Sequence, residues 1–149
     1  MVNYNLNNKE VIVFDGVCAL CNNFVIFVIK NDKKNLYKFV SLQNIEQNKL
    51  QDFDKLFNEK INSIVLIKKE LILSKSDAVI EIFRKLSFPY NLSPILLLIP
   101  RAIRNWAYNI IAKKRFKIFG KIEYCSIVYS KKNKSILKEK ILNSITDLK

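Results

Sequence analysis

Short apolar runs alternate with polar segments along the first part of the chain, and their spacing predicts alternating strands and helices. Residues 10–14 are a β-branched and aromatic run that stops at residues 15–16, which indicates a buried strand. Residues 18–30 are apolar on all sides around 24–29 and predict a buried helix, with a strand as the alternative because β-branched residues are frequent there. Residues 37–42 predict a second strand.

A helix, a pair of strands and another helix follow in this pattern. Residues 43–58 have the spacing of an amphipathic helix, and residues 63–67 and 71–73 indicate two strands joined by a tight turn without the favoured Asn-Gly pair. Ser76-Asp77 is expected to cap a helix over 78–86. A strand–helix–strand unit crosses over right-handed and makes its strands parallel, while a hairpin adds an antiparallel pair. The order therefore predicts an α/β chain with a thioredoxin-like, three-layer fold.

Two prolines, Pro89 and Pro94, interrupt the pattern and mark the predicted boundary. Residues 1–88 are predicted to form the thioredoxin-like core, and 89–149 a basic helical extension packed on it in one compact unit. Within this extension we expect one or more helices over residues 95–119, and a strongly basic helix from about residue 135 to residue 145.

The positive charge of the chain lies mostly in its second half. The sequence has 26 Lys and Arg against 13 Asp and Glu, a formal net charge of +13, and residues 75–149 hold 16 of those cations and 5 of those acids. Residues 101–121 contain seven cations and no acid, interleaved with Trp106, Tyr108, Phe116 and Phe119. We interpret them as a solvated basic face whose aromatic side chains point into the core. The alternative is a surface for nucleic acid or an anionic membrane.

Histidine is absent, and only two glycines are present. The lack of histidine excludes Ser-His-Asp and Cys-His catalysis and histidine-bound zinc or haem, so acid–base chemistry falls to carboxylates, Lys, Tyr or Cys. No Gly-x-Gly pair exists, which excludes glycine-rich phosphate loops. The N-terminus lacks the pattern of a signal peptide and the apolar runs are too short to span a bilayer, so we expect a cytoplasmic protein with reduced thiols.

The sharpest local signal is a Cys-x-x-Cys pair, Cys18 and Cys21, placed where a strand ends and a helix begins. Two intervening residues let the sulfurs meet across the first helical turn, and a helix N-terminus favours a thiolate. We hypothesise that Cys18, expected to be the more exposed thiol, attacks and that Cys21 resolves the mixed disulfide. Asp15 is the nearest candidate proton relay, with a helix-entry cap or turn residue as the alternative.

The same pair is also half of a zinc or iron–sulfur site. A four-ligand site within one chain lacks its last ligand, because Cys125 is the one other cysteine and there is no histidine. We therefore predict no metal and no bound cofactor, with a site shared by Cys18, Cys21 and Cys125 of two chains as the alternative. Cys125 itself is interpreted as a buried small hydrophobe, or as a third redox thiol if the C-terminal segment folds back over Cys18.

Several separated blocks around the motif resemble the DCC family of predicted thiol–disulfide oxidoreductases, named for Asp-x-x-Cys-x-x-Cys. Asp15, Cys18 and Cys21 are the matching motif positions. Further matching blocks follow in order up to Cys125, namely Ser41-Leu42-Gln43, Ser63-Ile64-Val65-Leu66-Ile67, Lys75-Ser76-Asp77-Ala78, Ile99-Pro100-Arg101 with Arg104, Trp106 and Tyr108, Ile111-Ala112-Lys113-Lys114-Arg115-Phe116 and Phe119-Gly120. The resemblance implies a thioredoxin-like fold and dithiol–disulfide exchange with a protein or low-molecular-weight thiol, driven by an external reductant.

The resemblance also points to residues outside the cysteine motif. Asn62 and Ser63 occupy the region in which thioredoxins usually carry a cis-proline that faces the disulfide, which makes Ser63 a candidate site residue. Arg101, Arg104 and Arg115 fall in matching blocks, and we hypothesise that some of them lie near a thiolate and favour it electrostatically.

The leading interpretation is a thiol–disulfide oxidoreductase that cycles a Cys18–Cys21 disulfide. One alternative is a non-enzymatic thioredoxin-like module whose basic half binds nucleic acid or an anionic membrane. The other is the metal site shared between chains.

Overall fold

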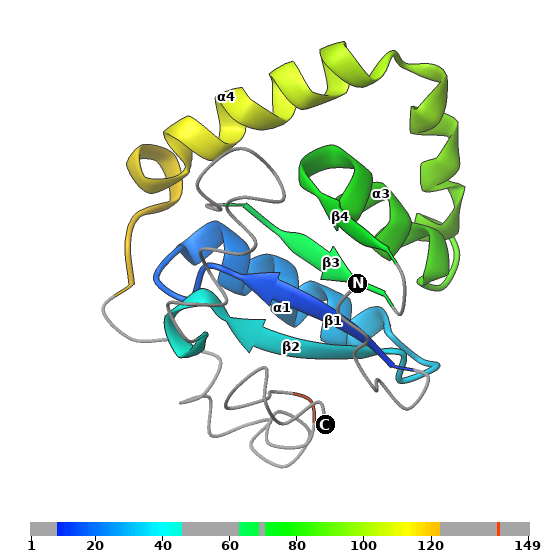
Figure 1. The fold of residues 1–149 in the computed structure, drawn as a ribbon, viewed down its shortest axis with the longest axis horizontal. Helices are drawn as coiled ribbons and strands as arrows, with labels where there is room; N and C mark the ends of the chain where they lie inside the picture. Colours follow the sequence, from blue (N-terminus) through cyan, green and yellow to red (C-terminus); the bar gives the residue numbers. More distant parts are fainter. Residues whose placement is uncertain (1–8, 46–62, 69–70, 123–139, 141–149) are drawn as a thin grey trace.

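Four strands form one mixed sheet in the part of the chain that this computed structural model describes, residues 9–45, 63–68, 71–122 and 140 (Figure 1). The strand order is β2-β1-β3-β4, with β2 parallel to β1, β3 antiparallel to β1 and β4 antiparallel to β3. Their bounds are Glu10–Phe14 for β1, Tyr37–Ser41 for β2, Val65–Ile67 for β3 and Ile72–Ser74 for β4. Consequently β1, β2 and β4 end, and β3 begins, at the same end of the sheet.

Helices α1 (Ala19–Asn31) and α3 (Lys75–Lys85) pack on the same face of this sheet. The pleat turns Ile12 and Phe14 of β1 toward these helices, while the intervening valines of β1 point to the opposite face and are equally buried. A strand buried on both faces has a continuous apolar sequence, which explains the run in β1. Phe83 of α3 joins the two helices, because its ring centroid lies 5.7 Å from those of Phe24 and Phe27 of α1.

The predicted α/β, thioredoxin-like fold is confirmed by this arrangement. The first strand, the helix after it, the second strand and the hairpin form as the apolar pattern predicts, and the strand alternative for residues 18–30 is wrong. The amphipathic helix predicted over residues 43–58 lies mostly outside the described residues, which show a 3-10 turn, η1, at Leu42–Asn44.

The predicted start of α3 is wrong. The N-cap position is Ser74, and Ser76 and Asp77 lie inside the first turn instead of capping it. Both side chains have partners on a distant helix, since the Ser76 hydroxyl donates to Asn105 and Asp77 forms an ion pair with Arg104. Tertiary contacts therefore use the polar side chains that the sequence pattern assigns to a local cap.

The remaining described elements are a 3-10 helix, η2 (Tyr90–Leu98), and a long α-helix, α4 (Arg101–Phe119). Helix α4 contacts α1 and α3 and runs along the upper side of the view in Figure 1. It ends at Gly120, whose φ of 82° is a conformation that glycine adopts without strain. The predicted basic helix near residues 135–145 lies outside the described residues except for Lys140, whose Nζ is 3.0 Å from Asp32 Oδ2.

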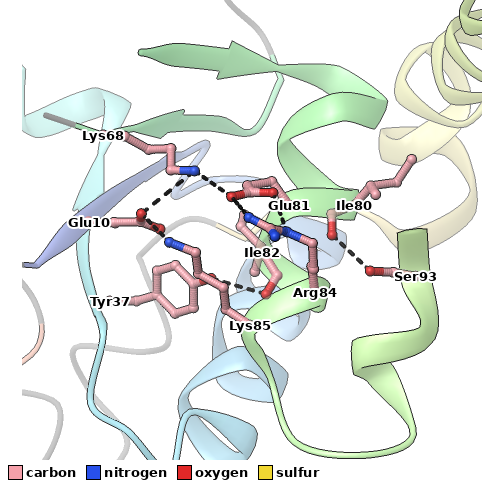
Figure 2. A network of polar contacts seen from close by, with 9 residues as sticks. All are labelled: Glu10, Tyr37, Lys68, Ile80, Glu81, Ile82, Arg84, Lys85 and Ser93. Carbon is pink, nitrogen blue, oxygen red and sulfur yellow. Dashed lines mark hydrogen bonds and ion pairs between the residues drawn. The ribbon is translucent and has the colours of Figure 1, made fainter. Parts of the chain in front are cut away.

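A network of ion pairs joins α3 to the sheet at the end opposite the cysteines (Figure 2). Glu81 of α3 accepts hydrogen bonds from Lys68 and from Arg84, whose Nε lies 2.7 Å from Glu81 Oε2, and Lys85 pairs with Glu10 of β1. Burial acts to raise the pKa of Glu81, but the hydrogen bonds from Arg84 and Lys68 outweigh it and lower the pKa to about 2.

We expect this network to make the protein sensitive to acid. The Glu81 carboxyl has a lower pKa folded than unfolded, so it contributes stability above its ordinary value of 4.5 and loses that contribution as the pH falls toward about 2. The Glu81→Gln variant should lose less stability than the unchanged protein between these two pH values. Urea unfolding at a series of pH values measures this difference, and parallel pH profiles for the two proteins would contradict it.

Candidate dithiol site

Cys18 and Cys21 lie where β1 passes into α1. Cys18 is the N-cap residue of α1, with extended backbone angles of φ −93° and ψ 117°, and its sulfur accepts a hydrogen bond from the Cys21 N–H at 3.4 Å. This is the position in which a side chain satisfies one of the unpaired N–H groups at a helix start. The spacing of the pair therefore puts both sulfur atoms in the first turn of one helix.

The turn before Cys18 is held by its own polar groups. Asp15 Oδ1 accepts from the Val17 N–H at 3.2 Å, and the Asp15 carbonyl accepts from the Cys18 N–H at 3.2 Å. From inside the helix, the amide nitrogen of buried Asn22 donates to the carbonyls of Gly16 and Cys18 at 2.7 and 2.9 Å. Asp15 therefore stabilises this turn through both its side chain and its carbonyl.

Gly16 lets the end of β2 approach this turn closely. Its N–H donates to Gln43 Oε1 at 2.9 Å. A Cβ at this position would lie 2.5 Å from Ser41 Oγ and 2.8 Å from Gln43 Oε1, closer than side chains pack. The missing side chain of Gly16 is therefore what admits Gln43.

The Asp15 carboxylate is buried and paired with an arginine from the far end of α4. Arg115 Nη2 lies 2.9 Å from Asp15 Oδ2, although the two residues are 100 positions apart in sequence, and both are at most 6% exposed. Gln43 Nε2 donates to the other carboxylate oxygen at 2.9 Å. A buried carboxylate needs such partners because removing it from water costs several kcal/mol. The pair fixes α4 against the cysteine turn.

Tyr108 extends the contact of α4 with this end of the sheet. It precedes Arg115 by two helical turns, and its hydroxyl accepts from the Ile64 N–H, just before β3, at 3.2 Å. Burial raises the pKa of Tyr108, while hydrogen bonds from Ile64 and Ser63 oppose this effect. The structure thus brings Ser63 to the Tyr108 hydroxyl on the cysteine side of the sheet.

The other two candidate arginines have different partners. Arg101 Nε lies 2.7 Å from Asp77 Oδ2, and Arg104 Nη1 lies 2.6 Å from Asp77 Oδ1. Both therefore bind the first turn of α3, and no contact of either with a cysteine is seen among the described residues. Of the three candidate arginines, Arg115 is the one that the structure places at the cysteine turn.

The two thiols have unequal surroundings. Burial raises the pKa of the Cys21 thiol to about 12, and its hydrogen bond with Cys18 acts in the same direction, while the Arg115 charge opposes them. Cys21 is therefore a protonated thiol at neutral pH, which suits a resolving group and not an attacking one.

Cys18 is less exposed than we expected. Its exposed fraction is 0%, against 4% for Cys21, so the expectation that Cys18 is the more accessible thiol is wrong. The cause is the segment that follows α4, which folds back over the start of α1. Lys121 forms an antiparallel β-bridge with Cys18, and the Ile122 N–H donates to the Val17 carbonyl at 2.9 Å.

Three residues of this site were not candidates from the sequence, namely Gln43, Asn22 and Tyr108. A signal exists for Gln43, because it follows β2 by two residues and the ends of parallel strands meet at one end of a sheet. A signal also exists for Asn22, which is a polar residue in an apolar helix four positions after Cys18. Tyr108 reaches the site because of where α4 lies, and no local sequence pattern predicts the position of α4.

Cys125 lies outside the described residues, three positions after Ile122. Within the described ranges, no three His, Cys, Asp or Glu residues are grouped so that they hold a metal ion. The described part of the chain also has no helix with the length and apolar character needed to cross a membrane.

Comparison with known proteins agrees with this geometry. The profile of the DCC1-like thiol-disulfide oxidoreductase family matches residues 12–121, a span that runs from β1 to the segment paired with Cys18. The chain belongs to this DCC1-like family. No solved structure matches it significantly.

Two relatives of this DCC1-like protein span most of its length. The uncharacterized protein YuxK of Bacillus subtilis is 38% identical over 119 residues, which cover 80% of this chain and 87% of YuxK. A chloroplastic DCC family protein of Arabidopsis thaliana is 30% identical over 122 residues, which cover 81% of this chain and 71% of the plant protein. The family name indicates a redox role, and neither relative's name gives a specific activity.

We expect Arg115→Met to destabilise this DCC1-like protein by about 3–5 kcal/mol, because it leaves the buried Asp15 carboxylate without its charge partner. Arg101→Met is the matched control, since it removes the same charge from a side chain that is 70% exposed, and it should cost less than about 1 kcal/mol. Adding Asp15→Asn to Arg115→Met should recover part of the loss. Urea unfolding measures all four proteins, and equal costs for the two arginine variants would refute the assignment.

We also expect the segment after α4 to control access to Cys18. Ile122→Pro removes the N–H that binds the Val17 carbonyl, and the loss of one hydrogen bond of about 1 kcal/mol should raise the rate of Cys18 alkylation about fivefold. Ile122→Ala keeps that N–H and is the control for the lost side chain. Alkylation of the folded protein with iodoacetamide, located by peptide mass, measures the rate. Equal rates for the two variants would show that this contact does not protect Cys18.

Proposed function

We propose that this protein is a thiol–disulfide oxidoreductase that cycles a disulfide between Cys18 and Cys21. The observation that carries the proposal is the hydrogen bond from the Cys21 N–H to the Cys18 sulfur at the start of α1. A sulfur held at this point faces the positive end of the helix dipole and accepts from an N–H that has no partner within the helix, and both interactions stabilise a thiolate. The family name supports the same chemistry.

The reaction takes place in two exchange steps. In the first, the Cys18 thiolate attacks one sulfur of a substrate disulfide, forms a mixed disulfide and releases one substrate thiolate, which takes up a proton. In the second, Cys21 loses its proton and attacks the Cys18 sulfur, which releases the other substrate thiol. Two electrons pass to the substrate, and an external dithiol or low-molecular-weight thiol returns them to the protein.

The unequal thiols support this order of attack. A thiol with a pKa of about 12 is almost entirely protonated at neutral pH, so Cys21 attacks only after a proton has been removed from it. Asp15 is the carboxylate whose charge acts on Cys21, and we assign it the role of proton acceptor for the second step. Arg115 and Gln43 hold that carboxylate in place, so we assign them positioning roles.

Trapping the mixed disulfide tests the proposal. In a Cys125→Ser background, mild oxidation with glutathione disulfide should produce an intramolecular disulfide that dithiothreitol reverses. Cys21→Ser should accumulate glutathione on Cys18, whereas Cys18→Ser should react at least about tenfold more slowly, because its remaining thiol is protonated. Mass measurement after alkylation counts the modified thiols.

Two outcomes of this experiment would overturn the proposal. Failure of the unchanged pair to form an intramolecular disulfide would reject the dithiol cycle. Faster modification of Cys18→Ser than of Cys21→Ser would reverse the assigned roles of the two cysteines. The Asp15 assignment has its own readout, because Asp15→Asn should slow release of glutathione from Cys18 without slowing its attachment.

A further inference from the structure

The outer surface of η2 and α4 carries large apolar side chains in contact with solvent. Among those that are more than half exposed, we call five the η2–α4 apolar face: Ile95, Leu97, Leu98, Ile103 and Trp106. Leu98 is 85% exposed and Trp106, the single tryptophan of the chain, is 65% exposed. A cluster of this kind is unusual on a surface that meets only water and marks an interaction site.

Helix α4 has its polar side turned inward. Arg104, Tyr108 and Arg115 lie on one side of the helix, where they contact Asp77, Ile64 and Asp15. Trp106 lies on the opposite side, and Ile103 lies about 100° around the helix from Arg104; both are more than half exposed. Around Trp106 this is the reverse of the usual arrangement, in which a surface helix buries its apolar side and exposes its polar one. The expectation that the aromatic side chains of this segment point into the core is therefore wrong for Trp106.

The charged residues of η2 and α4 themselves have a single sign. No Asp or Glu occurs between residues 82 and 122. Lys113, Lys114 and Lys117 are exposed on the C-terminal half of α4, and Lys121 is exposed just beyond its end. The arginines that face inward are already paired with Asp77 and Asp15, so the exposed lysines are the cations available to a partner of opposite charge.

We propose that the η2–α4 apolar face docks this protein on the surface of an anionic lipid bilayer. The apolar side chains enter the boundary between headgroups and acyl chains, and the lysines bind the anionic headgroups. The protein lies on the membrane by this face and does not cross it. This inference goes beyond the proposed redox function and does not depend on it.

Charge and chemistry favour a bilayer over the other occupants. A second copy of the chain, docked through the same face, would bring two sets of lysines together without an acid of η2 or α4 to balance them. Nucleic acid would use the cations and leave Ile95, Leu97 and Leu98 exposed to water, because phosphates and sugars do not cover aliphatic side chains. An anionic bilayer binds both, because its acyl chains cover the apolar side chains and its headgroups pair with the lysines.

Docking through this face would also place the dithiol site close to the membrane surface. The inner side of α4 carries Arg115, which binds Asp15 beside the cysteines. The site is therefore separated from the lipid headgroups by the thickness of one helix, about 10 Å. Disulfides close to a membrane surface would lie within reach of the site.

Vesicle binding by the full chain tests the proposal. Vesicles with equal parts of phosphatidylcholine and phosphatidylserine should bind the protein, shift the fluorescence of Trp106 to shorter wavelength and allow its quenching by brominated acyl chains. Vesicles of phosphatidylcholine alone should bind at least about fivefold more weakly, because the lysines then lack anionic headgroups. Binding to the mixed vesicles should fall as salt is added.

Paired variants separate the apolar and the electrostatic contributions. Leu98→Ser should weaken binding about tenfold because an exposed apolar anchor is lost, whereas Leu71→Ser, an exposed leucine outside the face, should not. The double variant Lys113→Glu with Lys117→Glu should weaken binding at least about tenfold. The same double change at Lys33 and Lys34, which are exposed elsewhere, should have little effect. The two leucines and the two pairs of lysines are all at the surface, and circular dichroism checks that each variant folds.

Three results would overturn the proposal. Absence of binding to the mixed vesicles would reject it outright. A concentration-dependent dimer that Leu98→Ser dissociates, seen by light scattering, would assign the face to a second copy. Binding of single-stranded RNA with the same Trp106 shift, without vesicle binding, would assign it to nucleic acid. None of these results bears on the disulfide between Cys18 and Cys21.

Discussion

The buried ion pair between Asp15 and Arg115 is the contact on which the arrangement of the site depends. It joins the end of β1 to the last turns of α4, across 100 positions of sequence. Because each charge is buried, neither is stable there without the other, so α4 has to lie across the end of the sheet. That placement brings Tyr108 to the start of β3 and directs the chain after Gly120 back over Cys18.

Local pattern was enough to predict the elements that form the core. β1 is recognisable as a buried strand because both of its faces are covered, and α1 is recognisable by its length and its continuous apolar character. The cysteine pair was also predictable, since the junction between a strand and a helix places two thiols in one turn. In each case the residues that decide the structure are neighbours in sequence.

Contacts between distant residues were not predictable in this way. The resemblance to a family selected Arg115 as a candidate, but nothing local distinguished it from Arg101 and Arg104, which bind Asp77 instead. The burial of Cys18 depends on Lys121 and Ile122, which are more than 100 positions later in the chain. The start of α3 was misplaced for the same reason, because its apparent capping side chain binds α4.

The inward polar side of α4 links the two proposals physically. A helix that turns arginine and tyrosine inward and exposes isoleucine and tryptophan gains less from the hydrophobic effect in water, so the polar contacts of Arg104, Tyr108 and Arg115 act together with the packing of Phe116 to hold it in place. The same exposed side chains lose their unfavourable contact with water at a lipid surface. Binding there would therefore stabilise α4 from its outer side, and with it the ion pair that holds Asp15 beside the cysteines.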